Sequence, residues 1–424
     1  MTNTLAKGQY LDLEITDMAY GGEGIAHIDG RVVFVRGGLP GDHVRAECTQ
    51  VKKRFAKASV VEVLTPSPIR TAPRCEAAAA GAGCCDFASV DPAQEAGLKR
   101  DVVLNQLAAL AGIELAPEQV TVVDFAQPTG WRTRMRLGTN AKGQVGMRKA
   151  RSSEIVPNTP CSQAVPELQE AIAAIGTVTP GAEVVAAYDG DGAISVVEIR
   201  KAARGRRRET IERTLSGTSL VQEHIADVSF KLPATAFWQA HSKAVQCYSD
   251  IITDMLQTAL GHDAKNQKAS CAWDLYGGVG AFAPAIATAL PKATIHSVEV
   301  SRAAAAAGQQ AFSKSSLRDA VEFHTADVAK LVPQLPQPEA VVLDPPRTGA
   351  GQDVIEAIAS AGPSAVVHIG CDAATFARDL GYWQAQGYCM DRLIVVDAFP
   401  GTHHCECVAL IRPSVSAASE QGDS

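Results

Sequence analysis

The sequence lacks any long apolar run. It contains no stretch of about 20 apolar residues that could span a bilayer. Its first ten residues, MTNTLAKGQY, also lack the apolar segment of a signal peptide. These absences exclude the common membrane and secretory patterns, and we expect a soluble protein that is located in the cytoplasm and has no membrane partner.

The cysteines lack the even number and regular spacing of a disulfide framework. The chain has 11 cysteines scattered among 424 residues. This usage fits a reducing compartment and indicates catalytic, metal-binding or buried roles. The length predicts two or three domains, and the 46% of hydrophobic residues is enough for sizeable cores.

The chain also lacks an excess of positive charge, since its formal net charge is −7. A negative total does not exclude a nucleic-acid partner, because binding depends on a basic face. Three basic blocks are present, the first being KKRFAK at residues 52–57. The second contains Arg132, Arg134, Arg136, Lys142, Arg148, Lys149 and Arg151, and the third contains Arg200, Lys201, Arg204, Arg206, Arg207 and Arg208.

These blocks allow two interpretations. Arginines at every second position of a strand lie on one face, where they could bind phosphates or simply keep an edge strand solvated. In the first block the aromatic Phe55 could stack on a base. Because separate basic blocks are unexpected in an acidic protein, they favour a polyanionic partner.

Residues 1–65 have the pattern of a small all-β unit. Short alternating strands, LDLEITDM, IAHI, RVVFV and ASVVEVL, are separated by glycine-containing turns. Such a series predicts a compact β-barrel. Pro66, Pro68 and Pro73 then mark a linker.

Residues 66–230 predict an α+β middle domain with a metal site. A helical pattern runs from Gln94 to Leu110, and four cysteines occur at Cys75, Cys84, Cys85 and Cys161. Closely spaced thiolates with one distant partner are typical of iron–sulfur ligands. The usual spacing leaves two residues between neighbours, whereas Cys84 and Cys85 are adjacent.

Residues 231–424 alternate between strand and helix patterns, which predicts a doubly wound sheet with its chemistry at the strand ends. A strand containing Asp274 enters the turn Tyr276-Gly-Gly-Val-Gly280, and the next strand ends at Glu299, where an acid can bind ribose hydroxyls. The dinucleotide pattern G-x-G-x-x-G is absent. Asp327 and Asp344 follow the next two strands.

The stretch AVVHIGCDAATFARDL, residues 365–380, predicts a strand, Cys371 and then a helix. Cys371 is either a small buried side chain or a thiolate nucleophile. A helix that begins at Asp372 would place its positive end near the sulfur and lower the pKa of the thiol.

Three motifs then carry a resemblance: DPPR at 344–347, GCDAATFARDL at 370–380 and FPGTHHCE at 399–406. Together the sequence resembles the RNA (uracil-5-)methyltransferase family, and its first unit resembles a TRAM domain. The order of the three regions is similar to the ribosomal-RNA branch. The resemblance implies a class I, Rossmann-like methyltransferase domain, a TRAM/OB-like barrel and a monomeric enzyme.

By the same resemblance, Cys371 would be the nucleophile and Glu406 the base. The S-adenosyl-L-methionine contacts would be Gln239, Tyr276, Glu299, Asp327 and Asp344, and the four cysteines of the middle domain would bind a [4Fe-4S] cluster. The expected substrate is a uracil in structured RNA, 23S ribosomal RNA in preference to transfer RNA. Gly277 and Ala281 depart from the family, which often has cysteine at the first position and asparagine or threonine at the second.

The chemistry explains why such residues are needed. Uracil C5 is a weak nucleophile, so a thiolate first adds to C6, C5 then takes the methyl group, and a base removes the C5 proton before the thiol leaves. A buried target base must also be flipped into the site.

Two alternatives differ in class. An enzyme that methylates another RNA base often has an aromatic residue after its Asp-Pro-Pro turn, where this chain has Arg347. A non-catalytic RNA-binding relative would lose Cys371 or Glu406, and both are present. Binding of S-adenosyl-L-methionine would separate the latter from an enzyme.

Overall fold

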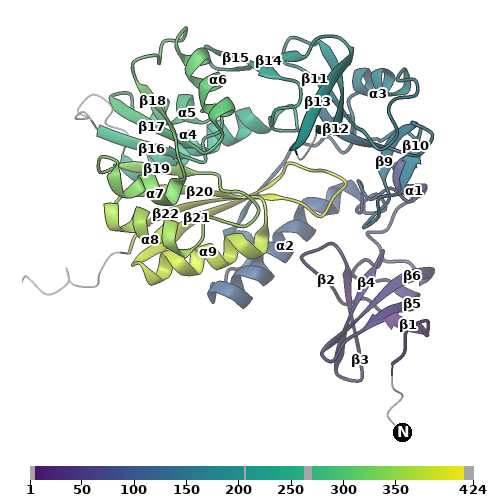
Figure 1. Ribbon diagram of the computed structural model, residues 1–424. Helices are drawn as coiled ribbons and strands as arrows, with labels where there is room; N and C mark the ends of the chain where they lie inside the picture. The colour runs from purple at the N-terminus through teal and green to yellow at the C-terminus, as the bar shows by residue number, and fades with distance from the viewer. Residues whose placement is uncertain (1–4, 205–206, 262–269, 415–424) are drawn as a thin grey trace, which may run out of the picture.

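The computed structural model describes residues 5–204, 207–261 and 270–414. Its strands form four sheets within these ranges. Figure 1 shows a small β unit, in purple, lying apart from a large layered α/β domain, with a second β-rich region between them in the chain. The predicted combination of a barrel, an α+β region and a doubly wound domain is confirmed.

The N-terminal unit is a six-stranded sheet in the order β1-β5-β6-β4-β3-β2. In β1, Leu11 and Leu13 face the core and alternate with exposed residues, which is why this polar stretch forms a strand. The predicted strand LDLEITDM is divided into β1 and β2, the other three predicted strands correspond to β3, β4 and β6, and β5 is an additional strand. The strands are β1 (Tyr10–Glu14), β2 (Asp17–Met18), β3 (Gly24–Ile28), β4 (Arg31–Arg36), β5 (His43–Val51) and β6 (Phe55–Thr65).

The middle region contains a second six-stranded sheet, in the order β10-β9-β8-β11-β12-β13. Its strands are β8 (Arg134–Thr139), β9 (Val145–Arg148), β10 (Ile155–Pro157), β11 (Glu183–Tyr188), β12 (Ile194–Arg204) and β13 (Arg207–Ser216). Two short helices, α1 (Glu76–Ala79) and α3 (Pro166–Ala173), accompany it, and the hairpin of β14 (Leu220–Ile225) and β15 (Val228–Pro233) follows.

The large sheet has eight strands in the order β18-β17-β16-β19-β20-β22-β21-β7. They are β7 (Thr121–Asp124), β16 (Ser270–Leu275), β17 (Ala293–Glu299), β18 (Val321–Thr325), β19 (Ala340–Leu343), β20 (Ala365–Gly370), β21 (Tyr388–Asp397) and β22 (Glu406–Pro413). Only β22 runs antiparallel to its neighbours, β20 and β21.

Helices cover both faces of this sheet, as Figure 1 shows. One core contains residues of α4 (Ala244–Leu260), α5 (Ala283–Ala289) and α6 (Arg302–Phe312). The other contains residues of α2 (Pro92–Ala111), α8 (Gln352–Ala361) and α9 (Ala373–Ala385). The short elements η1 (Pro117–Gln119), α7 (Val328–Leu331) and η2 (Val332–Gln334) complete the set. This is the doubly wound arrangement that the sequence predicts.

Residues 66–230, which the sequence predicts as one middle domain, are divided between the middle sheet and the large α/β domain. Its helix over 94–110 is α2, which begins at the capping carboxylate of Asp91 and ends at Gly112 in a left-handed conformation. Val103 and Leu107 of α2 pack into the core of the large sheet, and β7 adds to the edge of that sheet beside β21. The chain therefore enters the large domain before it completes the middle sheet.

No helix in the described ranges is both long and apolar enough to cross a membrane.

Candidate active site and cysteine group

Four of the predicted site residues lie at one edge of the large sheet. Tyr276 follows β16, Glu299 ends β17, Asp344 follows β19, and Cys371 follows β20. These strands are parallel neighbours, so their carboxyl ends meet at the same edge. In open α/β sheets this edge is where ligands bind.

Cys371 and Glu406 are placed beside each other by the pairing of β20 with β22. Gly370 lies opposite Cys407 in this antiparallel pair, so the next residue on one strand and the preceding residue on the other share the end of the ladder. The charge of Glu406 also acts on the Cys371 thiol. The nucleophile and base suggested by resemblance are thus neighbours in space.

The predicted helix after Cys371 is α9, and Asp372 caps it by accepting a hydrogen bond of 2.9 Å from the Thr375 amide. The prediction that this helix lowers the pKa of the thiol is wrong. Burial, together with the charges of Glu406 and Asp344, raises the pKa of Cys371 to about 12, although Arg347 acts in the opposite direction. In this state the thiol is protonated at neutral pH.

Three carboxyl groups are gathered at this edge with raised pKa values. Burial raises the pKa of Asp274 to about 6, against a hydrogen bond of 2.9 Å from Ser297. Burial and then the charge of Asp274 raise the pKa of Asp344 to about 7. Burial and then Asp344 raise the pKa of Glu406 well above its ordinary value. A cation placed among them would lower all three pKa values, so the site suits a positively charged ligand.

Glu406 also carries an unsatisfied atom. Its Oε2 is buried and has no hydrogen-bond partner among the described residues. A buried carboxyl oxygen without a partner costs free energy, and such groups tend to occur where function requires them. This oxygen is therefore available to a group that enters the site.

The glycine turn after β16 is shaped around Asp274. A Cβ atom at Gly277 would lie 2.3 Å from Oδ2 of Asp274, so this turn has room only for glycine. Tyr276 adopts φ of 59°, a left-handed conformation that a non-glycine residue rarely takes. Glu299 accepts hydrogen bonds from the amides of Gly278 (3.1 Å) and Ser301 (2.6 Å). The absence of the family's cysteine at 277 thus has a steric reason.

The two remaining predicted contacts are Asp327 and Gln239. Asp327 follows β18 and precedes α7, at the same end of the sheet. Gln239 is half-buried in the connection between β15 and α4, and within the described chain it makes no hydrogen bond to the strand-end residues. Its neighbour Phe237 is 78% exposed. An exposed aromatic side chain offers a surface on which a base can stack.

Sequence reasoning missed Tyr20, which reaches the active site from the N-terminal unit. Its hydroxyl donates a hydrogen bond to the Asp372 carboxylate, 352 residues away in the chain. A cavity of about 10 Å³ lies beside Cys371 and is lined by Tyr20, Val102, Cys371, Ala373, His403, His404 and Cys405. This space is on the order of one water molecule, so a uracil cannot enter without movement of the lining.

The segment 397–405, which precedes Glu406, is fixed by buried polar contacts that the sequence did not reveal. Lys99 of α2 donates to Asp397 at 2.5 Å and to the carbonyl of Phe399 at 3.1 Å. Glu95, also on α2, accepts from the amide of Gly401 at 2.7 Å. Helix α2 thus positions the segment that leads to the candidate base.

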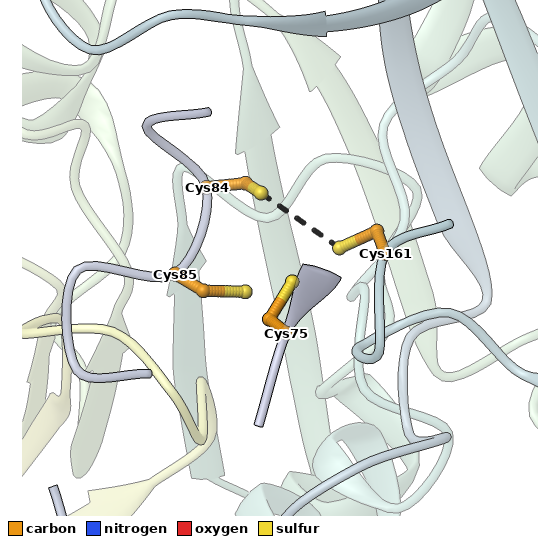
Figure 2. A group of neighbouring side chains, drawn as sticks. All are labelled: Cys75, Cys84, Cys85 and Cys161. Carbon is orange, nitrogen blue, oxygen red and sulfur yellow. Dashed lines mark hydrogen bonds between the residues drawn. The ribbon is translucent and has the colours of Figure 1, made fainter. Parts of the chain in front are cut away.

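The second site is the cysteine group, defined as Cys75, Cys84, Cys85 and Cys161. Its four sulfur atoms all lie within 4.8 Å of one another. Figure 2 shows the side chains converging, with 3.8 Å between the sulfurs of Cys84 and Cys161. The adjacency of Cys84 and Cys85 does not prevent this, because both side chains reach the same group. The predicted clustering is confirmed.

The thiols of the cysteine group act strongly on one another's pKa values. Hydrogen bonds from Cys161, Cys84 and Cys85 hold the pKa of Cys75 well below its ordinary value, whereas contacts with Cys161 and Cys75 raise the pKa values of Cys84 and Cys85. The Arg132 guanidinium lies close enough to interact with the charges of the other thiols. Sulfur donors at this spacing fit zinc or an iron–sulfur cluster. Arg132, which the sequence suggested as a phosphate contact, is therefore placed to balance negative charge at the group.

The cysteine group and the active-site segment are joined directly. The amide of Phe87 donates to the carbonyl of Gly401 at 3.0 Å, and the amide of His403 donates to Asp86 at 3.1 Å. Gln163 donates to the carbonyls of Cys84 at 2.9 Å and Pro400 at 3.5 Å. The residues beside the four cysteines thus contact the segment that carries Glu406.

The second basic block is only partly a free basic face. Arg134 is buried in an ion pair with Glu223 at 2.7 Å, whereas Arg136 and Arg148 share Glu183. An open groove of about 550 Å³ remains beside Cys84. Its basic lining residues are Arg136, Arg148, Lys149 and Arg151, each 44–60% exposed at the side chain. We call this the basic groove.

The first basic block is exposed, whereas the third lies partly outside the described residues. Lys52, Lys53 and Arg54 are exposed in the turn between β5 and β6. Arg206 lies outside the described residues, as do the side chains of Arg204, Arg207 and Arg208. Arg200 and Lys201 lie on β12.

Comparisons with known proteins extend over the whole chain. Residues 5–61 match the model of the TRAM domain, and residues 219–413 match that of the tRNA (uracil-5-)methyltransferase family. A protein of Corynebacterium glutamicum named as an RNA methyltransferase is 49% identical over 97% of this chain and 99% of its own. A 23S rRNA (uracil(1939)-C(5))-methyltransferase of Alcanivorax borkumensis is 28% identical over 93% of this chain and 95% of its own.

A solved structure shows the same fold. The tRNA (uracil-54, C5)-methyltransferase of Pyrococcus abyssi, in complex with S-adenosyl-L-homocysteine, superposes with a TM-score of 0.71. The match covers 94% of this chain and 99% of that one at 19% identity. With the domain order, the strand-end site and the named relatives in agreement, the chain belongs to the RNA (uracil-5-)methyltransferase family.

Proposed function

We propose that this enzyme transfers a methyl group from S-adenosyl-L-methionine to C5 of a uracil in RNA, through a covalent bond between Cys371 and C6. The observation that supports this most directly is the placement of Cys371 beside Glu406, with the unpartnered oxygen of Glu406 in a buried site. One thiol and one base are the two protein groups that the reaction needs.

S-adenosyl-L-methionine supplies a methyl group on a positively charged sulfur. Tyr276, Glu299, Asp327 and Asp344 lie at one end of the sheet and would bind it. Gln239, in the connection before α4, is the fifth contact that the resemblance implies. Its positive charge would compensate the buried carboxyl groups of Asp344 and Glu406 and return their pKa values toward the ordinary range. The same charge would favour the thiolate of Cys371.

In the reaction, the Cys371 thiolate forms a bond to C6 of uracil, and the electron pair moves onto C5 and O4. C5 then takes the methyl group, and the donor sulfur keeps the bonding electrons. Glu406, as a carboxylate, removes the proton from C5. The electrons of that C–H bond restore the C5–C6 double bond and expel the Cys371 thiolate. Atoms and charges balance over these steps.

RNA would contact the N-terminal unit and the basic groove. The groove lies beside Cys84, and residues adjacent to Cys84 contact the segment before Glu406, so phosphates there would be close to the site. The target base would be flipped out of folded RNA. We propose ribosomal RNA as the substrate, on the resemblance to the 23S rRNA enzyme; transfer RNA is the alternative, since the solved neighbour acts on it.

We further propose that the cysteine group binds a metal centre. A [4Fe-4S] cluster fits four thiolates and a neighbouring cation. A single zinc ion is the alternative, because sulfur atoms at most 4.8 Å apart are near the edge of about 3.8 Å of a tetrahedron with Zn–S bonds of about 2.3 Å. Iron and sulfide analysis of anaerobically purified protein separates the two. Colourless protein that loses one equivalent of zinc in Cys75→Ser, but not in the control variant Cys271→Ser outside the group, would exclude the cluster.

The covalent mechanism is tested by trapping its intermediate. Attack and methyl transfer do not need the base at C5, so Glu406→Gln should accumulate methylated uridine bonded to Cys371. Substrate RNA and donor with a labelled methyl group should give a slow band on a denaturing gel. The double variant Cys371→Ala/Glu406→Gln is the matched control and should give none. A folded Glu406→Gln variant that binds both ligands without forming the band would disprove the base assignment.

A further inference from the structure

Away from the active-site edge, two histidines and a glutamate converge on the outer strands of the large sheet. His296 lies on β17, and Glu322 and His324 lie on β18, which is the edge strand. His296 is opposite Glu322 in the parallel register, and His324 is two residues further along β18. Because side chains alternate along a strand, the three project from the same face.

The distances between their polar atoms are those of metal ligands. His296 Nδ1 lies 3.0 Å from His324 Nε2 and 3.4 Å from Glu322 Oε2, and all three ligand atoms are within 4.8 Å of one another. Ligands about 2.1 Å from one ion, at tetrahedral or octahedral angles, are separated by about 3.0–3.5 Å. The observed spacing therefore leaves room for a single ion.

Hydrogen bonding alone satisfies this arrangement poorly. The same atom, His296 Nδ1, faces both the second histidine and the carboxylate, so only one of the two contacts can be a hydrogen bond in a given tautomer. A metal ion accepts lone pairs from all three groups at once.

We propose that His296, Glu322 and His324 form a site for a divalent transition-metal ion of the zinc class. Imidazole and carboxylate are ligands that zinc accepts, and three protein ligands leave a fourth position. That position would face solvent, because the Glu322 side chain is 59% exposed. The ion would link the edge strand β18 to β17, the strand that ends at Glu299. This site is separate from the cysteine group and from the residues assigned to methyl transfer.

The test uses full-length protein as isolated, with the cysteine group in its native state, and Zn²⁺ alone as the probe. Calorimetric titration should show one additional equivalent bound per chain. His324→Ala and Glu322→Gln should each weaken zinc binding by at least 10- to 100-fold. Mutation of a residue that only hydrogen-bonds to a metal ligand already lowers metal affinity by about this factor, so loss of a ligand itself should cost no less. Glu322→Gln changes an exposed side chain without changing its size, so it preserves the fold. His27→Ala, an exposed histidine on β3, should have no effect.

Two results would overturn the proposal. One is an equal Zn²⁺ stoichiometry and affinity in wild type and in the His296→Ala/His324→Ala double variant. The other is a crystal grown with Zn²⁺ whose anomalous map at the zinc edge shows no peak between the two imidazoles. A peak there, with loss of the extra equivalent in Glu322→Gln, would confirm the site.

Discussion

The two thiol sites of this enzyme are built in different ways. Cys371 is a single thiol at the end of a strand, and burial together with the carboxyl groups of Glu406 and Asp344 raises its pKa. The cysteine group takes its four thiols from the residue before α1, a loop and the stretch before α3, and its members interact mainly with one another. A buried thiol near carboxyl groups stays protonated until a cation binds beside it, whereas thiols that lie close together can bind a metal ion jointly.

Both sites are nevertheless connected to the same segment, residues 397–405. The segment 397–405 is contacted from one side by Lys99 and Glu95 of α2 and from the other by Asp86 and Phe87, next to the cysteine group. Damage to the cysteine group can therefore disturb the position of Glu406, whereas loss of the Cys371 sulfur leaves the cysteine group intact. This asymmetry can be tested.

The largest expected effect is the loss of turnover in Cys371→Ala. Removal of the proposed nucleophile should lower kcat by on the order of 10⁴-fold or more, as for other covalent catalysts. Metal content and RNA affinity should not change, because the side chain is small and contacts neither the cysteine group nor the basic groove. Cys389→Ala, at an exposed cysteine on β21, is the matched control. Loss of metal in Cys371→Ala would show that the two sites are not separable.

The next effect concerns the buried ion pair that holds the segment 397–405. Lys99→Met removes the cation from a buried pair and leaves Asp397 without its partner, since both side chains are at most 4% exposed. Breaking such a pair costs about 3–5 kcal/mol of unfolding free energy. Urea unfolding followed by tryptophan fluorescence measures this. Lys142→Met, at an exposed lysine, should remain within about 0.5 kcal/mol of wild type. An equal loss in both variants would refute a special role for Lys99.

A smaller effect is expected in the reactivity of the thiol. With a pKa of about 12, only roughly 10⁻⁵ of Cys371 is thiolate at pH 7, and the greater nucleophilicity of that thiolate offsets part of the deficit. Alkylation by iodoacetamide should be on the order of 100-fold slower than for an ordinary exposed thiol. Because the pKa lies above the whole range, the rate should rise about tenfold per unit from pH 7 to pH 10. Mass spectrometry of the Cys371 and Cys389 peptides measures both rates; a plateau for Cys371 near pH 8 would contradict the raised pKa.

The local pattern of the sequence predicted the five strands β16, β17, β18, β19 and β20 of the large sheet, because each is a short strand-like run followed by a helix. It did not reveal β5, whose inward residues include only the small side chains of Ala46 and Cys48 next to Val44. Nor could it show that β7 pairs with β21, since Thr121 and Ile394 are brought together only by the tertiary fold.

The active site was likewise predictable only where local sequence pattern determines it. Residues at successive strand ends share an edge by topology, so Glu299, Asp344 and Cys371 could be grouped from the sequence. Contacts across the chain could not: Lys99 reaches Asp397 over 298 residues, and the acids that neutralise much of the second basic block come from other strands. The thiol pKa was mispredicted because the helix dipole was considered without the burial of Cys371 and the nearby carboxyl groups of Glu406 and Asp344.

The smallest expected effect tests whether the N-terminal unit controls access to one thiol site only. Tyr20 lines the cavity of about 10 Å³ beside Cys371 and is tied to Asp372 by its hydroxyl. Tyr20→Phe removes that hydrogen bond but keeps the ring, and the loss of about 1 kcal/mol corresponds to a roughly fivefold larger open population. Alkylation of Cys371 should therefore become about fivefold faster at fixed pH, with no change in metal content. Tyr10→Phe, at an exposed tyrosine of the same unit, is the control. If Tyr20→Phe leaves the alkylation rate of Cys371 unchanged in folded protein, Tyr20 only positions Asp372, and entry of the uracil must depend on His403 or His404 instead.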